Sequence, residues 1–160
     1  FSSGSLGHGL PAGVGMALGA KRAGKGYRVV VLMSDGEINS GANWEAIMMA
    51  SGQRLDNLLV IVDRNRLQAM GFTEDIIPLG DLVGKFKAFD WAAKVIDGHD
   101  YKSIKAALDM FPFLDEKPSV IIANTIKGKG VSFIENRLEW HYKSPNEDEF
   151  KKAMKELEIS

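Results

Sequence analysis

The chain has 160 residues, 45% of them hydrophobic, and a formal net charge of −1 at pH 7, as expected for one globular domain with a sizeable core. The charge is near zero and no long basic run occurs, which argues against a protein that binds nucleic acid or an anionic membrane surface. No apolar stretch reaches the ~20 residues of a membrane-spanning helix, and the lack of cysteine excludes disulfides and agrees with a reducing compartment, so we expect a cytoplasmic protein.

The chain opens with a glycine-rich loop over residues 2–9, in which Leu6 is the one large apolar side chain. A helix is expected over residues 10–23, because apolar residues recur at helical spacing and Pro11 suits a first turn. The small residues of this helix would let it approach a neighbouring element closely. Taken alone, the segment is a linker followed by a core helix.

The next segment reads as strand, helix, strand. Apolar runs at residues 29–33 and 58–62 each end in a turn with an acidic or amide side chain, and a helix-length stretch at residues 42–53 lies between them. In such a right-handed βαβ crossover the strands are parallel, either adjacent or one strand apart, and their carboxyl ends open on the same edge of the sheet. We therefore expect Asp35 and Asn65 to face one crevice.

These residue types suit a hard cation in that crevice. Asp35 offers a charged oxygen and Asn65 a neutral one, and the turn that follows can aim the main-chain carbonyl of Leu67 at the same point, a set that suits Mg²⁺ or Ca²⁺. Mg²⁺ keeps positions for water and phosphate oxygens, so few protein ligands suffice beside a diphosphate. Gly36 would let the backbone approach a phosphate without a Cβ in the way. The alternative is an ordinary turn dipeptide and an unrelated loop asparagine.

Helix and strand keep alternating through the rest of the chain. The expected elements are a helix at residues 79–89, a strand at 91–96, a helix at 101–114 with Asp100 as N-cap, and a strand at 119–123. Four strands with intervening helices predict a doubly wound α/β layer sandwich, with a parallel sheet covered on both faces. In the tail, Ser144 and Glu147 predict a capping box with Pro145 at the first helical position, and a helix that runs to about Leu157.

Two histidines and two lysines have ordinary explanations. His8 lies in the glycine-rich loop and His99 in an Asp-Gly-His-Asp turn, and neither has a partner visible in the sequence, so we expect loop hydrogen bonds rather than catalysis. Lys127 and Lys129 could attract a diphosphate or a sugar phosphate, but such a pair is also typical of a solvated turn.

Asn65 lies thirty positions after Asp35, and this spacing resembles the thiamine-diphosphate motif, Gly-Asp-Gly followed by Asn, with Ser34 in place of the first Gly. The similarity extends over essentially the whole chain and narrows to the N-terminal part of transketolase, particularly the form split into two shorter chains. The segments that carry it are Gly4-Ser5-Leu6-Gly7-His8-Gly9, Trp44-Glu45-Ala46, Leu55-Asp56-Asn57-Leu58, Asp63-Arg64-Asn65, Asp97-Gly98-His99-Asp100, Thr125-Ile126-Lys127-Gly128-Lys129-Gly130 and Glu139-Trp140-His141.

The resemblance implies a thiamine-diphosphate-binding fold over residues 1–160 and transfer of a two-carbon ketol unit between sugar phosphates, with thiamine diphosphate and Mg²⁺. It places the metal on Asp35, Asn65 and the carbonyl of Leu67. His141 matches the family histidine that reaches the diphosphate and the sugar, and is the expected catalytic residue. The residues expected at the cofactor are Gly4, Ser5, Leu6, Gly36, Glu37, Asn65 and His141.

The resemblance also implies a partner. In the family, the Glu that activates the aminopyrimidine ring comes from a separate pyrimidine-binding domain, which 160 residues cannot supply. We expect a homo- or hetero-oligomer with cofactor sites between subunits, a partner like the C-terminal part of transketolase, and no activity without it. Residues 10–23 and 40–49 flank the site and are the expected contacts. Because the chain begins with Phe1 rather than Met, we also expect a fragment, or the ordered part of a longer chain.

Three positions depart from the family pattern. Ser40 stands where the family has a Glu of a carboxylate network to which Glu45 would belong, Ala42 where split forms often have Gln, and Tyr142 where Gly follows the histidine. Two alternatives therefore stay open. One is another thiamine-diphosphate enzyme, such as a 1-deoxyxylulose-5-phosphate synthase or an oxo-acid dehydrogenase component, against which the Glu-Trp-His run argues. The other is a non-catalytic relative that keeps the cofactor pocket, for which Ser40 is the reason.

Overall fold

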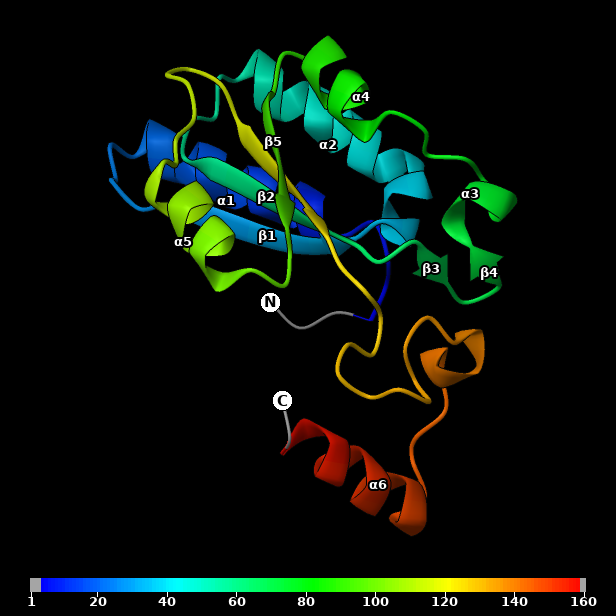
Figure 1. The fold of residues 1–160 in the computed structure, drawn as a ribbon. Coiled ribbons are helices and arrows are strands. Elements are labelled where there is room, and N and C mark those ends of the chain that lie inside the picture. Colours follow the sequence, from blue (N-terminus) through cyan, green and yellow to red (C-terminus); the bar gives the residue numbers. More distant parts are fainter. Residues whose placement is uncertain (1–3, 159–160) are drawn as a thin grey trace.

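The computed structural model describes residues 4–158 and has the alternation of strands and helices that the sequence predicts (Figure 1). Its centre is a parallel sheet in the order β1-β2-β6-β5, four-stranded within the described residues. The strands are β1 (Val29–Ser34), β2 (Leu58–Arg64), β5 (Ala92–Asp97) and β6 (Ser119–Asn124). β1 and β2 are adjacent, which decides between the two arrangements left open for the βαβ unit.

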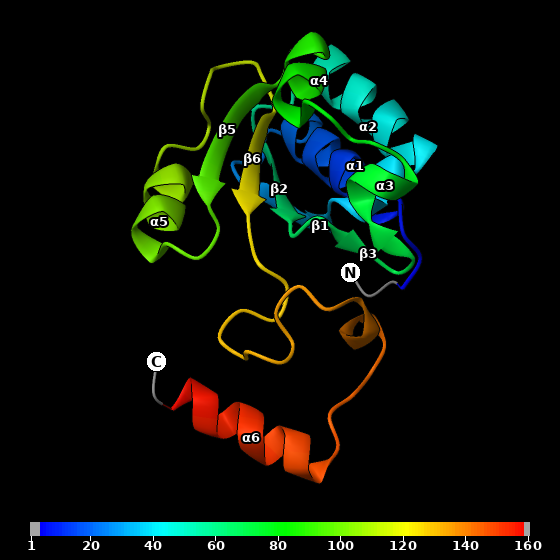
Figure 2. The same ribbon diagram turned by 45° about the vertical axis from the view of Figure 1, so that its right-hand side comes forward.

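Three helices cover one face of this sheet (Figure 2). They are α1 (Gly9–Arg22), α2 (Gly41–Gly52) and α4 (Leu82–Ala88). The buried residues of α1 recur every three or four positions, so one stripe of the helix faces the core. Alternate strand residues point into the same core, because successive side chains of a strand lie on opposite faces. The main core therefore lies between the sheet and these helices.

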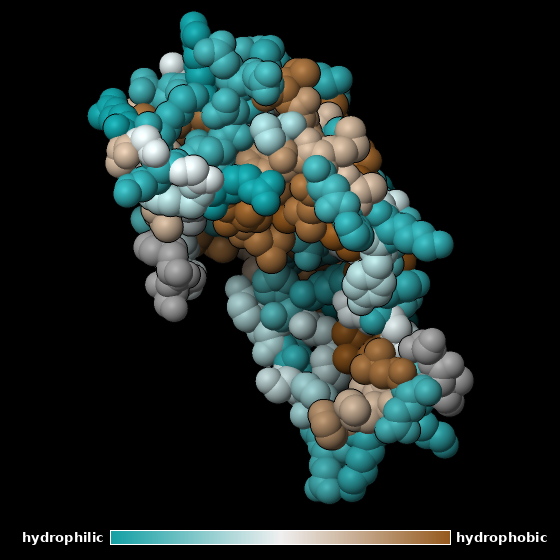
Figure 3. Space-filling view, turned by 90° about the vertical axis from the view of Figure 1, so that its left-hand side faces the viewer, coloured by the Kyte–Doolittle hydropathy of each residue, from teal (hydrophilic) through white to brown (hydrophobic). Residues whose placement is uncertain are grey.

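The opposite face is covered only in part. α5 (Tyr101–Asp109) packs Ala107, followed by Phe111 of the next loop, against Leu59, Ile121 and Ala123 of the inner strands. The side chains that β1 presents on this face stay in solvent. Figure 3 shows apolar groups on the underside of the sheet body, beside the hollow above the part that contains α6 (Glu147–Leu157).

Strand register aligns the carboxyl ends of the strands. Ser34 of β1 pairs with Asp63 of β2, and Asn124 of β6 lies opposite Arg64 on one side and Asp97 on the other. A row of polar and charged residues therefore occupies one edge of the sheet, which is where open α/β sheets bind ligands.

Two helices are shorter than predicted. α4 begins at Leu82 rather than at residue 79, because the Asp81 side chain accepts a hydrogen bond from the Gly84 N–H at 2.9 Å and caps the helix there. α5 starts at Tyr101 with Asp100 as its N-cap, as predicted, but it ends at Asp109 rather than at residue 114. Pro112 follows soon after, and proline cannot donate the hydrogen bond that would continue a helix.

The predicted start of the terminal helix was also wrong. The capping box is formed by Asn146, whose Oδ1 accepts from the Glu149 N–H at 2.9 Å, while Glu149 accepts in return from the Asn146 N–H at 2.9 Å. Ser144 and Glu147 have the same spacing two positions earlier, so the sequence holds two overlapping capping patterns. Pro145 precedes the cap instead of opening the helix.

Several short elements were not predicted. They are the hairpin of β3 (Leu67–Gln68) and β4 (Gly71–Phe72), the single turn α3 (Thr73–Ile76), and the 3₁₀ helices η1 (Gly36–Asn39) and η2 (Leu138–His141). Each is four residues or fewer, too short for a periodic pattern. Among residues 4–158, no helix has the length and apolar character needed to cross a membrane.

Candidate functional site

Asp35 lies directly after β1 and is fully buried, with 0% of its surface exposed. Its Oδ1 accepts a hydrogen bond from the Gly36 N–H at 2.8 Å, and its Oδ2 accepts one from the Arg66 N–H at 2.7 Å. Because Arg66 follows Asn65 in the chain, this carboxylate ties the turn after β1 to the turn after β2. The structure thus brings Asp35 and Asn65 together at the sheet edge, as the βαβ unit predicted.

The electrostatics of this edge favour a cation. Desolvation by burial is the largest influence and raises the pKa of Asp35 above its ordinary value. The two N–H groups pull the pKa down and the Asp63 carboxylate pushes it up, while Arg64 offsets Asp63 only in part. The net result is a buried acid with too little positive charge around it. A divalent cation at this position would stabilise the ionised form.

The turn after β2 holds Asn65 in a defined position. Arg66 adopts a left-handed backbone with φ of 66°, which is uncommon for a residue with a side chain. The Oδ1 of Asn65 accepts a hydrogen bond from the Leu67 N–H at 2.9 Å, and Leu67 itself is buried. An amide oxygen has two lone pairs, so this Oδ1 retains acceptor capacity for a metal ion.

Gly36 sits in a close-packed position beside Gln68. A Cβ added to Gly36 would lie only 2.9 Å from the Cβ of Gln68, so a side chain here would displace the β3–β4 hairpin. The Nε2 of Gln68 is itself buried and has no hydrogen-bond partner within the described residues. A buried donor without a partner is unfavourable, and a ligand oxygen would satisfy it. The sequence did not single out Gln68, since a lone glutamine in a short hairpin follows no pattern.

Glu37 holds the glycine-rich loop against the end of β1. Its Oε1 accepts from the Gly7 N–H at 2.9 Å and its Oε2 from the Ser34 N–H at 3.4 Å. Gly7 has a φ of 81°, and a Cβ on it would lie 2.7 Å from the Cβ of Ser40. Glu37 therefore positions the loop, with both carboxylate oxygens engaged by main-chain donors.

The loop thus held presents Gly4, Ser5 and Leu6 at the surface, and Leu6 is 63% exposed. Ser2 and Ser3, which begin the predicted loop, lie outside the described residues. The Nδ1 of His8 lies 3.1 Å from the Leu6 carbonyl, which agrees with the loop hydrogen bond expected for this histidine.

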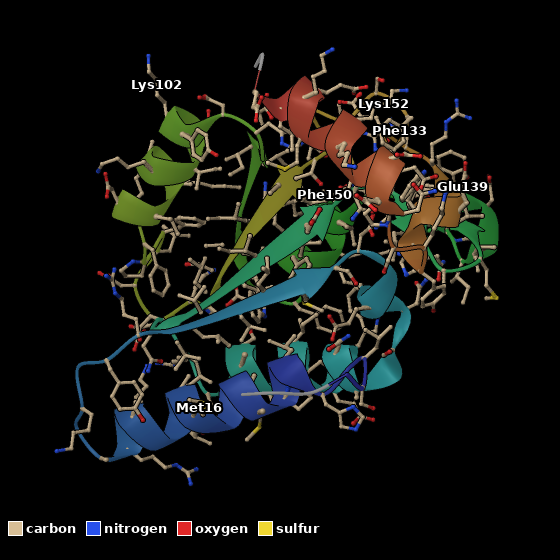
Figure 4. All side chains as sticks on the ribbon, turned by 90° about the horizontal axis from the view of Figure 1, so that it is seen from below. Met16, Lys102, Phe133, Glu139, Phe150 and Lys152 are labelled. Carbon is tan, nitrogen blue, oxygen red and sulfur yellow. The ribbon has the colours of Figure 1, made fainter. Side chains whose placement is uncertain are left out.

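η2 lies against β3 and places His141 next to the turn that carries Asn65. Trp140 packs edge-on against Phe133 with ring centres 5.5 Å apart, and Lys143 lies over Trp140 at 4.1 Å, so aromatic contacts hold this segment. His141 is partly buried, and its Nδ1 is buried with no hydrogen-bond partner within the described residues. Figure 4 shows Glu139 of the same turn beyond the carboxyl ends of the strands.

A cavity of about 710 Å³ continues from Asn65 along the same edge of the sheet. Its polar lining includes Asn65, Asp97, His99, Asn124, Thr125 and Lys129. The Nε2 of His99 accepts from the Ile126 N–H at 2.8 Å, so His99 is a loop hydrogen-bonding residue as expected. Lys129 lies 3.8 Å from Glu135, which partly neutralises it. Among residues 4–158 no cluster of three or more His, Asp or Glu side chains is arranged for a metal, so a cation here would need ligand oxygens from its partner molecule.

Comparison with known proteins agrees with this geometry. Residues 1–160 match the family model described as "Transketolase, thiamine diphosphate binding domain". One of the named subunits of apulose-4-phosphate transketolase from Actinobacillus succinogenes is 45% identical over 157 residues, which are 98% of this chain and 56% of that protein. The 6-deoxy-6-sulfo-D-fructose transketolase subunit SqwG of a Clostridium species is 42% identical over 158 residues, 99% of this chain and 58% of that protein.

Among solved structures, transketolase from Campylobacter jejuni superposes with a TM-score of 0.91 at 29% identity, over 98% of this chain and 26% of that one. The α/β fold with a parallel sheet is thus shared with transketolases. The chain spans little more than half the length of the two curated relatives that it matches.

Proposed function

This chain belongs to the family of transketolase thiamine diphosphate binding domains, and we propose that residues 1–160 are the diphosphate-binding domain of an enzyme that transfers two-carbon ketol units between sugar phosphates. The observation that carries the proposal is the fully buried Asp35 carboxylate, hydrogen-bonded to the turn that carries Asn65. Its raised pKa is the property expected of a buried ligand that needs a cation to balance its charge.

The described residues fit thiamine diphosphate with Mg²⁺. We assign the metal to the Asp35 carboxylate, the Asn65 amide oxygen and the Leu67 carbonyl, with the diphosphate completing its coordination. Gly36 supplies the close-packed backbone, and the unpartnered Gln68 Nε2 and His141 Nδ1 supply polar groups that await a ligand. Gly4, Ser5 and Leu6 lie in the loop that Glu37 fastens to the same edge, where they would meet the rings of the cofactor.

The bound cofactor supplies the electron sink that lets a ketose lose its two-carbon unit. The protein residues bind and orient. Asp35 and Asn65 hold the diphosphate through the metal, and Glu37 keeps the glycine-rich loop at the end of β1. His141 offers an uncommitted ring nitrogen to the sugar or the diphosphate, and its position beside β3 lets it move a proton at a substrate hydroxyl.

The names of the relatives suggest the wider class of substrate and partner. The relatives at 45% and 42% identity are named for different phosphorylated or sulfonated sugars, so the substrate of this chain is assigned here only as a sugar phosphate. Both names denote one subunit of an enzyme, which supports a partner that carries the pyrimidine-binding domain. We place the assembly in the cytoplasm, in line with the absence of cysteine.

The test is ketol transfer by the assembled protein, with ketose phosphates such as fructose 6-phosphate as donors and a panel of aldose phosphates as acceptors. We expect product formation that requires both thiamine diphosphate and Mg²⁺. Decarboxylation of pyruvate onto an aldose phosphate, without ketol transfer, would instead favour a 1-deoxyxylulose-5-phosphate synthase. Cofactor binding without any turnover would favour a non-catalytic relative.

That non-catalytic alternative has one observation in its favour. Ser40 packs against Gly7 at the mouth of the cofactor loop, and it supplies no carboxylate where the family has one. A Ser40→Glu variant of the assembled protein would decide whether this matters. A large gain in turnover would show that the native chain lacks a working proton relay, while unchanged turnover would show that Ser40 is compatible with catalysis.

A further inference from the structure

One face of the sheet is left open beside β1. Val30 and Leu32, which point away from the main core, are 55% and 71% exposed. Across residues 4–158, α5 is the helix that packs on this face, and it covers β5 and β6 rather than β1. Parallel sheets in proteins almost always have both faces covered, because their strands are apolar on both sides. An open face of this kind is expected to have an occupant.

The open face is hollowed as well as apolar. A cavity of about 170 Å³ lies against it, lined mainly by Leu32, Ile61, Ile96, Ile104, Leu108 and Ile121. Viewed from below, β1 and β2 are not overlaid by any helix of their own layer, with α5 to one side (Figure 4). The surface therefore offers a strip between α5 and the free edge of β1, bordered by aliphatic side chains.

A second unpartnered apolar surface lies on the same side of the molecule. α6 exposes Phe150, Met154 and Leu157, which recur at helical spacing and form one stripe. The helix is held by the Ser132 N–H and hydroxyl, which donate to Glu156 at 2.6 and 3.0 Å, and by Lys152 over Phe133 at 4.7 Å. Figures 1 and 2 show α6 standing below the sheet and apart from it.

The relatives indicate what could fill the space between these two surfaces. The match covers 56% of one relative and 58% of the other, so each contains a large part with no counterpart in residues 1–160. That part belongs to the same polypeptide as the matched domain. α6 projects past the open face, which leaves room for one inserted element but obstructs the approach of a second sheet (Figure 2).

We propose that the open face, defined by Val30, Leu32, Ile61 and Leu108, is the docking surface for a helix of the same polypeptide from outside residues 1–160. This helix lies between the sheet and the apolar stripe of α6 and completes the second helical layer of the sandwich. The proposal concerns packing and is independent of the chemistry assigned to Asp35 and His141.

The lack of cysteine in these residues makes the proposal directly testable by thiol labelling. Leu32→Cys and Val30→Cys are introduced singly into the full polypeptide, with any native cysteine outside residues 1–160 replaced by serine. The matched control is Lys102→Cys on α5, whose side chain points into solvent (Figure 4). Native protein is treated with a maleimide, and each rate is divided by the rate of the same variant in denaturant.

We expect the cysteines at positions 30 and 32 to react at least 100-fold more slowly than the one at position 102, in the full polypeptide without its partner. Equal rates would overturn the proposal. Protection that appears only when the partner chain is added, or that grows with protein concentration, would also overturn it, since the occupant would then be another chain.

A photo-crosslinking residue at position 32 gives a second readout that does not depend on thiol chemistry. We expect adducts within one polypeptide, to peptides outside residues 1–160. Adducts to another chain, or none in a protein that melts cooperatively, would contradict the assignment.

Discussion

At the scale of single residues, Asp35 shows how this domain trades stability for a binding site. Burial raises its pKa, so in the metal-free protein the folded state holds the proton more tightly than the unfolded chain, whose value is near 3.8. The contribution of Asp35 to stability therefore falls as the pH rises from 3.8 through the raised pKa. Ionisation is needed for metal binding, and the bound cation then offsets the cost of a buried negative charge.

Removing the Asp35 carboxylate should weaken binding of thiamine diphosphate with Mg²⁺ by at least about 100-fold, because even residues that only support a metal ligand are worth about 10–100-fold. Asp35→Ala and the nearly isosteric Asp35→Asn are compared by calorimetry in the assembled protein. Asp109→Asn, on the exposed surface of α5, is the control. In the native protein the affinity should also fall as the pH drops through the raised pKa of Asp35. Unchanged affinity in Asp35→Ala would refute the metal assignment.

His141 should act on substrate more than on folding. It lies in a short 3₁₀ turn and is only partly buried, so His141→Ala should shift the melting temperature by no more than a few degrees. Turnover should drop by about 10²–10⁴-fold if the ring transfers a proton. Trp91→Phe is the opposite control, because Trp91 is buried and its Nε1 donates to the Ile47 carbonyl at 3.0 Å far from the site. Parallel losses of stability and activity in His141→Ala would mark a structural role.

Residues of the site differ in how far the sequence could reveal them. Asp35 and Asn65 follow apolar strands directly, so the rule that parallel strands end on one edge was enough to bring them together. Gln68 depends on a two-residue strand and on the absence of a Cβ at Gly36, and neither follows from a local pattern. The bond from Gly7 to Glu37 joins residues 30 positions apart, and only the folded chain shows it.

At the scale of elements, the strands were predicted more accurately than the helix ends. β1, β2 and β6 are runs of aliphatic residues bounded by turns, and strands of buried parallel sheets have this pattern because they are apolar on both faces. Helix ends depend instead on which of several possible caps forms. Asp81 and Asn146 won over neighbours with similar side chains, and that competition is settled by tertiary contacts.

The packing of α1 on β1 gives a prediction at this scale. A Cβ at Gly13 would overlap the Val31 side chain, whereas one at Gly15 would meet nothing within 4 Å. Gly13→Ala should therefore destabilise the fold by about 1–3 kcal/mol through overpacking. Gly15→Ala, in the same helix, should stabilise it by roughly 0.5–1 kcal/mol, because alanine loses less backbone entropy. Thermal or urea melting of both variants tests the pair, and equal effects would show that α1 does not pack this closely.

At the scale of the whole molecule, the described residues build one wall of a site. The cavity beside Asn65 lies at an open edge of the sheet, and the loop with Leu6 projects beyond it. α1 and α2 flank this loop and expose Met16, Met48 and Met49, which are 54%, 51% and 44% exposed (Figure 4 labels Met16). Exposed methionines beside a site are typical of a surface that packs against another protein.

This architecture predicts that the polypeptide is inactive by itself. Ketol transfer needs a cleft that excludes water and a group to activate the aminopyrimidine ring, and one open sheet edge provides neither. Mixing the purified polypeptide with the partner encoded beside it should give a larger species by light scattering, together with thiamine-dependent activity. Met49→Arg, which places a charge on the proposed contact surface, should weaken this assembly at least about 10-fold, since an unpaired charge in an interface costs more than about 1.4 kcal/mol. Lys102→Glu, on the far side of α5, should leave it intact. Enzyme-like turnover by the polypeptide without any partner would show that the site is complete within one chain, and the two-chain assignment would then be wrong.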